Sequence, residues 1–163
     1  MKNDPADCLA SGVELAREGK DVRLPSTGIL ERVRALESKI ILILEDEPSL
    51  RELMAHQLKR RGYAVLLAST SSEALNFWKE HSGEIKLLVT DMVIGDGTTG
   101  CDLAEKLLAL NPSLKVIYTS GFDRKVVEQD YTLGKGAAFL QKPYDPKELE
   151  RIIDAMLIAP PNG

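Results

Sequence analysis

Strand and helix patterns alternate from Lys39 to about residue 158, and this alternation is the strongest constraint on the fold. Apolar runs typical of strands occur near residues 40–45, 63–68, 85–90, 114–119 and 136–141, and helix patterns occur near residues 48–61, 71–81, 100–110, 124–131 and 145–157. Continuous apolar strands that alternate with helices are typical of a parallel sheet covered on both faces. The sequence therefore predicts an α/β fold: a doubly wound, five-stranded parallel sheet in the order 2-1-3-4-5.

The first part of the chain does not continue this alternation. One helix pattern begins near Asp4 and a second begins at Thr27, with a polar stretch between them. Residues 1–38 are therefore predicted to form an N-terminal extension, made of two short helices or partly disordered. Residues 39–158 are predicted to form one domain, and residues 159–163 a short tail.

Composition and charge argue against several classes of protein. Of the 163 residues, 44% are hydrophobic and 28% are charged, and no apolar run approaches the roughly 20 residues that a membrane-spanning helix needs. The N-terminal segment lacks the pattern of a secretory signal, so we expect a cytoplasmic chain without membrane attachment. A net charge of −4 at pH 7 argues against direct binding of nucleic acid, which normally requires a basic surface. The two cysteines are too few for a disulfide framework or a zinc site.

Polar residues follow the predicted strands at the point where each strand ends. In an open parallel sheet these ends lie along one edge, and ligands bind where the strand order reverses, here between the first and third strands. The residues concerned are Glu45, Asp46 and Glu47 after the first strand, Asp91 after the third, Ser120 after the fourth and Lys142 after the fifth. The strand order therefore predicts a single polar site built from four strand ends.

These side chains suit a divalent cation and a phosphoryl group. The carboxylates of Glu45, Asp46 and Asp91, held within a few ångströms, would repel one another unless a cation neutralised them. Mg²⁺ is the expected ion, because it prefers oxygen ligands and commonly combines carboxylates with phosphate oxygens. Asp91 is the candidate nucleophile, since a carboxylate can accept a phosphoryl group as an aspartyl-phosphate. The Lys142 ammonium group and the Ser120 hydroxyl group suit the oxygens of that phosphoryl group.

A glycine-rich motif lies directly after Asp91 and suggests a different ligand. Residues 95–100, Gly-Asp-Gly-Thr-Thr-Gly, match the G-x-G-x-x-G fingerprint of dinucleotide-binding folds. The fingerprint places its tight turn at the strand end, whereas here several residues, beginning with Asp91, separate the strand from Gly95. Dinucleotide binding through Gly95, Gly97 and Gly100 is therefore a remote alternative. We expect these glycines to let the loop after Asp91 turn freely.

Residues 39–158 resemble the receiver domain of two-component response regulators. Four segments carry the resemblance: ILILEDEP at residues 41–48, LVTD at 88–91, VIYTSGF at 116–122 and LQKPY at 140–144. The sequences of these segments are most similar to those of receivers in hybrid histidine kinases. The resemblance implies the flavodoxin-like form of the predicted sheet.

The resemblance also implies how the phosphoryl group arrives. Asp91 would take it from a phosphohistidine on a histidine kinase or a histidine phosphotransfer protein. Glu45 and Asp46 would hold Mg²⁺ directly or through water, joined by Asp91 and the main-chain carbonyl of Val93. A phosphohydrolase that uses Asp91 with Mg²⁺ is an alternative, although haloacid dehalogenase-like enzymes carry a second aspartate at the position of Val93. We therefore expect a signalling phosphoacceptor that catalyses only its own phosphorylation and dephosphorylation.

The resemblance also implies that phosphorylation switches the conformation of the domain. Ser120 would close on the phosphoryl oxygen, Lys142 would pair with it, and Phe139 would occupy the aromatic switch position. The Lys142–Pro143 peptide bond is expected to be cis. The surface formed by the fourth helix, the fifth strand and the fifth helix would then change its preference for a downstream protein partner. The sequence leaves open whether the chain forms a homodimer.

Several positions depart from the usual receiver pattern. Glu45 replaces the commoner aspartate, and Gly95 stands where a proline is usual. Val93 and Phe122, each two residues beyond a predicted site residue, cannot orient an attacking water molecule. We therefore predict that the aspartyl-phosphate hydrolyses slowly.

Overall fold

The elements of the fold follow the alternation of patterns in the sequence. A computed structural model describes residues 39–158 apart from residues 96, 126, 128–133 and 135. The described elements are β1 (Ile40–Leu44), α2 (Pro48–Arg60), β2 (Ala64–Ala68), α3 (Ser71–His81), β3 (Ile85–Asp91), α4 (Gly100–Leu110), β4 (Lys115–Ser120), β5 (Ala137–Gln141) and α6 (Pro146–Ile158). The predicted extension, the predicted tail and most of the helix predicted at 124–131 lie outside the described residues.

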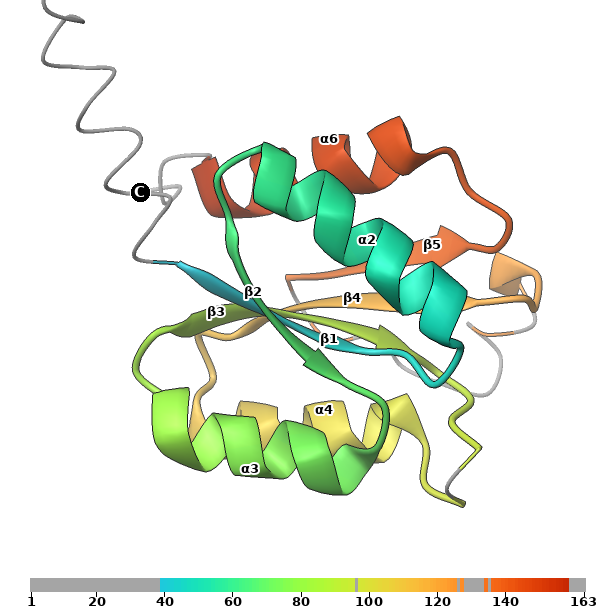
Figure 1. The fold of residues 1–163 in the computed structure, drawn as a ribbon. Coiled ribbons are helices and arrows are strands. Elements are labelled where there is room, and N and C mark those ends of the chain that lie inside the picture. Colours follow the sequence, from blue (N-terminus) through green and yellow to red (C-terminus); the bar gives the residue numbers. More distant parts are fainter. Residues whose placement is uncertain (1–38, 96, 126, 128–133, 135, 159–163) are drawn as a thin grey trace, which may run out of the picture.

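The strands form one parallel sheet in the predicted order. The five-stranded sheet runs β2-β1-β3-β4-β5, and every neighbouring pair is parallel. In Figure 1, α2 and α6 cover one face of the sheet and α3 and α4 cover the other. This doubly wound arrangement confirms the predicted fold class. No helix within the described ranges is long and apolar enough to cross a membrane.

The core lies on both faces of the sheet, which explains why β1 is apolar throughout. Every residue of β1 is buried. Leu42 and Leu44 belong to the cluster on the α3 and α4 face, together with Trp78. Ile41 and Ile43 belong to the cluster on the α2 and α6 face. Because successive side chains of a strand point to opposite faces, a strand covered on both sides has no polar position.

Local chemistry determines where the helices begin. Glu47, which the sequence grouped with the acids of the site, caps α2: its carboxylate accepts hydrogen bonds from the main-chain N–H groups of Ser49 and Leu50. At α4 the Thr99 hydroxyl and the Asp102 carboxylate form a reciprocal capping box. Capping therefore directs Glu47 to the helix terminus.

The glycines after Asp91 have different roles. Gly97 has a φ of +82°, which favours glycine and agrees with the expected turn. Gly100 does not have a positive φ. A Cβ atom at Gly100 would overlap with the Asp91 carbonyl and the Thr90 hydroxyl. For Gly100 the expectation of a freely turning loop is therefore wrong, since glycine is required there because α4 begins in close contact with the end of β3.

Candidate functional site

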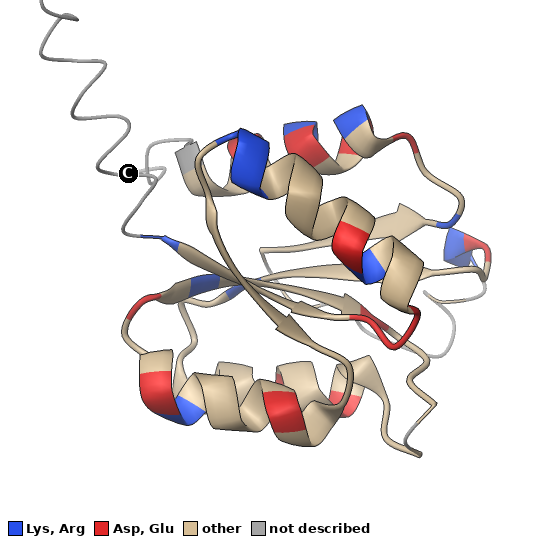
Figure 2. Ribbon diagram, in the orientation of Figure 1, with Lys and Arg blue, Asp and Glu red and all other residues tan. Residues whose placement is uncertain are grey.

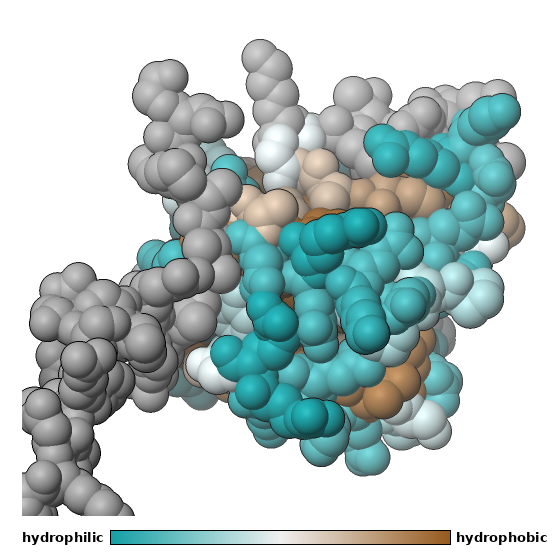
Figure 3. Space-filling model, turned by 90° about the horizontal axis from the view of Figure 1, so that it is seen from above, coloured by the Kyte–Doolittle hydropathy of each residue, from teal (hydrophilic) through white to brown (hydrophobic). Residues whose placement is uncertain are grey.

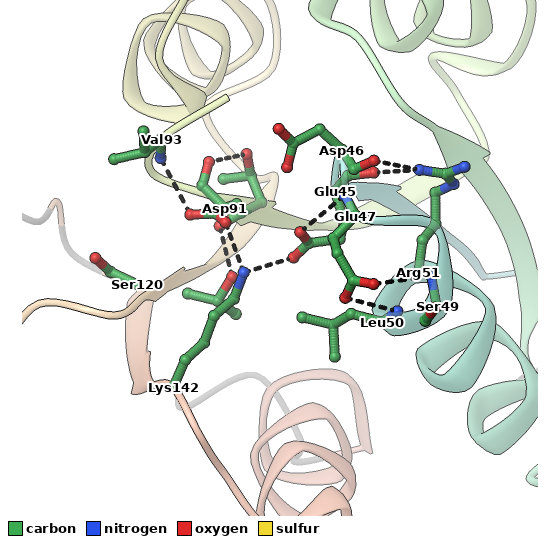
Figure 4. Close-up of polar contacts among 12 residues, drawn as sticks. Glu45, Asp46, Glu47, Ser49, Leu50, Arg51, Asp91, Val93, Ser120 and Lys142 are labelled. Atoms are coloured by element: carbon green, nitrogen blue, oxygen red, sulfur yellow. Dashed lines mark hydrogen bonds and ion pairs between the residues drawn. The ribbon is translucent and has the colours of Figure 1, made fainter. Parts of the chain in front are cut away.

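The carboxyl ends of β1, β3, β4 and β5 meet at one edge of the sheet. Figure 2 shows the acidic residues that follow β1 gathered in the loop at this edge, and Figure 4 shows the side chains that converge there. The close-up includes Glu45, Asp46, Asp91, Ser120 and Lys142. The five side chains that the sequence predicts for the site thus come from four strand ends and lie at one edge of the sheet.

Lys142 links two of the acids. Its Nζ atom donates hydrogen bonds to Asp91 Oδ2 at 2.5 Å and to Glu45 Oε2 at 2.7 Å. Glu45 is almost entirely buried, with 1% of its surface exposed. The Lys142–Pro143 peptide bond is cis, as expected. One ammonium group thus faces the carboxylates of two strand ends.

Burial and pairing shift the ionisation of this pair. Burial raises the pKa of Glu45 above its ordinary value, and the hydrogen bond from Lys142 offsets this only in part. Burial lowers the pKa of Lys142, but hydrogen bonds to Asp91 and Glu45 outweigh burial, so its pKa is raised overall. Lys142 therefore stays positively charged at neutral pH.

Glu45, Asp46 and Asp91 form a cluster with the chemistry of a magnesium site. Each offers one carboxylate oxygen, and these oxygen atoms all lie within 4.8 Å of one another. Lys142 neutralises one of the three negative charges, so a net negative charge remains when all three acids are ionised. Hard oxygen donors with net negative charge fit Mg²⁺.

Main-chain N–H groups contact the carboxylates of Asp91 and Asp46, and Arg51 contacts the main chain that carries Glu45 and Asp46. The Val93 N–H group donates to Asp91 Oδ1 at 3.1 Å, and the Gly95 N–H group donates to Asp46 Oδ2 at 3.1 Å. Arg51 Nη1 donates to the carbonyl oxygens of Glu45 at 2.7 Å and of Asp46 at 3.2 Å. The contact made by Arg51 is not predictable from the sequence, because an arginine in the first turn of a helix forms part of no motif.

Ser120 and Phe139 lie on the neighbouring strands, β4 and β5. Ser120 is buried, and its Oγ atom accepts a hydrogen bond from the Phe122 N–H group at 3.1 Å. Phe139 is buried beside Tyr118, its partner in the parallel register. The Lys142 N–H group donates to the Ser120 carbonyl at 2.7 Å, which joins the ends of the two strands. Ser120 thus ends β4 with its hydroxyl held by its own loop, whereas Phe139 lies within β5 and belongs to the core cluster on the α3 and α4 face.

An apolar pocket of about 330 Å³ adjoins the site. Its lining comes from α2 and from the segment between β5 and α6: Leu50, Leu53, Met54, Gln57, Lys142, Pro143, Tyr144 and Pro146. Leu53, one of the lining residues, is 47% exposed. Figure 3 looks onto the face that carries α2 and α6 and shows exposed apolar surface between hydrophilic side chains. The pocket shares Lys142 with the acidic cluster.

Comparisons with known proteins agree with this geometry. A family model described as the response regulator receiver domain matches residues 41–154. The response regulator receiver protein CpdR of Brucella abortus is 30% identical over 121 residues, which is 74% of this chain and 98% of CpdR. Sensor kinase CckA of the same species is 31% identical over 74% of this chain, and the matched part is only 13% of CckA.

Solved structures show the same relationship. The crystal structure of the receiver domain from hybrid histidine kinase CckA superposes with a TM-score of 0.62 and 33% identity, and covers 72% of this chain and 98% of that one. A response regulator receiver protein from Sinorhizobium medicae shares the fold with a TM-score of 0.67 at 23% identity, over 76% of this chain and 98% of its own. Together with the convergence of acids and lysine at the carboxyl edge of the sheet, these matches show that the chain belongs to the response regulator receiver domain family of two-component systems.

Proposed function

We propose that Asp91 accepts a phosphoryl group from a phosphohistidine on a histidine kinase or a histidine phosphotransfer protein. The observation that carries this proposal is that the Asp91 carboxylate contacts the Lys142 ammonium group and clusters with the carboxylates of Glu45 and Asp46. In the transfer, the nitrogen–phosphorus bond of the phosphohistidine breaks and a bond forms between phosphorus and an Asp91 carboxylate oxygen. The electron pair of that bond stays on the ring, and a histidine whose other ring nitrogen carries a proton leaves as neutral imidazole. No separate base is needed, because the attacking carboxylate has no proton to lose.

Lys142 would pair with the negative charge before and after the transfer. Its ammonium group donates a hydrogen bond to Asp91 Oδ2 while the carboxylate is unphosphorylated. Phosphorylation moves the negative charge from the carboxylate to the phosphoryl oxygens, and the flexible ammonium group can then pair with one of them. The Ser120 hydroxyl group would give up the hydrogen bond that it accepts from the Phe122 N–H group and would donate a hydrogen bond to another phosphoryl oxygen. The position of Phe139 would change with that movement, and so would the surface offered to a downstream protein partner.

Mg²⁺ would be held by Glu45, Asp46, Asp91 and the Val93 carbonyl group. When bound, the ion would neutralise charge that develops on the phosphoryl oxygens during transfer. Glu45 is buried and paired with Lys142, so we propose that it acts on the ion through water rather than directly. Asp46 is exposed and is the acid best placed to contact the ion itself.

The apolar pocket would receive the phosphodonor. We propose that a helix that carries the phosphohistidine docks its apolar face on Leu53 and the pocket beside it. The pocket shares Lys142 with the acidic cluster, so a helix seated there would bring its histidine close to Asp91. Helix-in-groove binding of this type uses apolar anchors at helical spacing.

The test is phosphorylation of the full chain by a small-molecule phosphodonor, such as acetyl phosphate, with Mg²⁺. Intact-mass spectrometry should show one added phosphoryl group on the wild-type protein and none after Asp91→Asn. Glu105→Gln, at an exposed position on α4, is the matched control and should behave as wild type. An Asp91→Asn protein that is phosphorylated as fully as wild type would overturn the proposal. Repeated turnover of phosphomonoesters, instead of one stoichiometric transfer, would favour the phosphohydrolase alternative.

A further inference from the structure

The main-chain amide of Gly95 contacts a proposed magnesium ligand from a distant part of the chain. Its N–H group donates to Asp46 Oδ2 at 3.1 Å, across 49 residues of sequence. Asp46 is exposed, and an exposed aspartate side chain with no anchor samples several rotamers. The hydrogen bond engages one carboxylate oxygen and leaves Oδ1 for another ligand.

Glycine gives this contact two properties that other residues lack. A Cβ atom at position 95 would lie 3.0 Å from Asp46 Oδ2, closer than ordinary van der Waals contact, so a side chain would press on the carboxylate. A proline, the residue that is usual here in the receivers that the sequence resembles, has no N–H group to donate. Gly95 therefore combines a donor with open space beside Asp46.

The segment that carries Gly95 is anchored on both sides. Val93 pairs with Thr99 in an antiparallel bridge. The hydroxyl groups of Ser71 and Thr98 lie 2.5 Å apart and join the segment to the beginning of α3. A donor held in this way can orient Asp46 rather than follow it.

We propose that the Gly95 amide is a positioning group for Mg²⁺: it holds Asp46 in the orientation that presents its second oxygen to the ion. This inference rests on the proposed function, since it assumes that Asp46 is a ligand. Carboxylates that bind metals are commonly oriented by a hydrogen bond from an outer group, and loss of such a group lowers metal affinity about tenfold or more. Magnesium binding is thereby linked to the loop between β3 and α4.

The test compares Mg²⁺ affinity of the full chain and its variants, measured by ¹H–¹⁵N NMR titration without phosphodonor. Gly95→Pro, which removes the donor, should weaken Mg²⁺ binding about tenfold. Gly95→Ala keeps the donor and should weaken it less. Gly83→Ala, at a glycine with open space around its Cβ position, is the control and should bind as wild type. Equal affinity of Gly95→Pro and wild type would overturn the inference, and so would equal losses for the alanine and proline variants, since the cause would then be space and not the N–H group.

A second measurement does not depend on the folding of the proline variant. In the protein without metal, Asp46→Ala should speed hydrogen exchange of the Gly95 amide and leave that of Gly83 unchanged. An unchanged exchange rate at Gly95 would contradict the hydrogen bond on which the inference is built. If the wild-type protein binds no Mg²⁺, the proposed function fails together with this inference, whereas normal wild-type binding with an unaffected proline variant removes this inference alone.

Discussion

Lys142 is the residue on which the ionisation of the site depends, because it pairs with two carboxylates that differ in burial. The Glu45 side chain is almost inaccessible, whereas that of Asp91 is partly exposed. A buried carboxylate that loses its partner cannot turn to water and must either carry an uncompensated charge or take up a proton. Removal of Lys142 should therefore lower the stability of the protein mainly through its effect on Glu45.

We expect Lys142→Met to destabilise the metal-free protein by about 2 kcal/mol at pH 8 and by less at pH 5. Burial already raises the pKa of Glu45 above 4.5, and loss of the Lys142 hydrogen bond raises it further. An acid whose pKa is higher in the folded state binds more protons there, so its contribution to stability falls as pH rises through the interval between the two pKa values. The interval between the folded and unfolded pKa values of Glu45 is wider in the variant. The difference in stability between the variant and wild type therefore grows with pH.

Urea unfolding in the presence of a chelator, at several pH values, measures this difference. Lys147→Met, which removes an exposed lysine near the start of α6, is the matched control and should cost little at any pH. A loss for Lys142→Met that is the same at pH 5 and pH 8 would show that Glu45 is not the residue affected.

The lifetime of the proposed aspartyl-phosphate should also depend on single residues. Val93 and Phe122 lie two residues beyond Asp91 and Ser120, and their apolar side chains are 58% and 59% exposed. Neither can accept or donate a hydrogen bond that would orient an attacking water molecule. We expect the phosphorylated protein to persist for minutes or longer in buffer with Mg²⁺, and Val93→Asn to shorten this lifetime severalfold.

Intact-mass measurements over time after removal of the phosphodonor follow the decay. Leu110→Asn replaces another exposed apolar residue, at the far end of α4, and should leave the lifetime unchanged. A wild-type lifetime of seconds would contradict the prediction.

At the scale of elements, the junction between β3 and α4 brings the start of a helix against the strand that carries Asp91, the proposed phosphoacceptor. We expect Gly100→Ala to destabilise the protein by about 1 to 3 kcal/mol, because the added methyl group overlaps with the backbone of Asp91 and with the Thr90 side chain. Gly83→Ala adds the same atoms in open space and is the control. Urea unfolding compares the two, and equal losses would mean that close approach at Gly100 is not the cause.

The same junction shows what a sequence can and cannot predict. The strands and the acids at their ends follow from apolar runs that stop at polar residues, so the sheet order and the region of the site are predictable. The contacts of Glu47 and Arg51 are not predictable. The sequence shows an acid and a base near the site, but it does not show whether each side chain faces the site or the helix terminus. The glycine motif predicts a turn at Gly100, because close packing against β3 depends on three-dimensional geometry that the motif does not encode.

At the scale of the whole molecule, the described domain has a core on each face of its sheet. One cluster packs α3 and α4 against the strands, and the other packs α2 and α6. Because β1 and β3 contribute to both clusters, loss of either layer exposes the same central strands. A shared central layer of this kind favours cooperative unfolding of residues 39–158 as one unit.

We therefore expect a fragment of residues 38–158 to unfold in one transition and to keep the stability of the full chain within about 0.5 kcal/mol. The fragment retains both clusters and the hydrogen bond from Lys39 Nζ to the Leu157 carbonyl, which joins the start of the domain to the end of α6. Urea unfolding followed by far-ultraviolet circular dichroism and by Trp78 fluorescence tests this, since the two signals report on the helices and on the core. A fragment starting at Ile41, which lacks Lys39, is the control and should be less stable. If the 38–158 fragment is markedly less stable than the full chain, residues 1–37 contribute to the fold, and the division into an extension and an independent receiver domain is wrong.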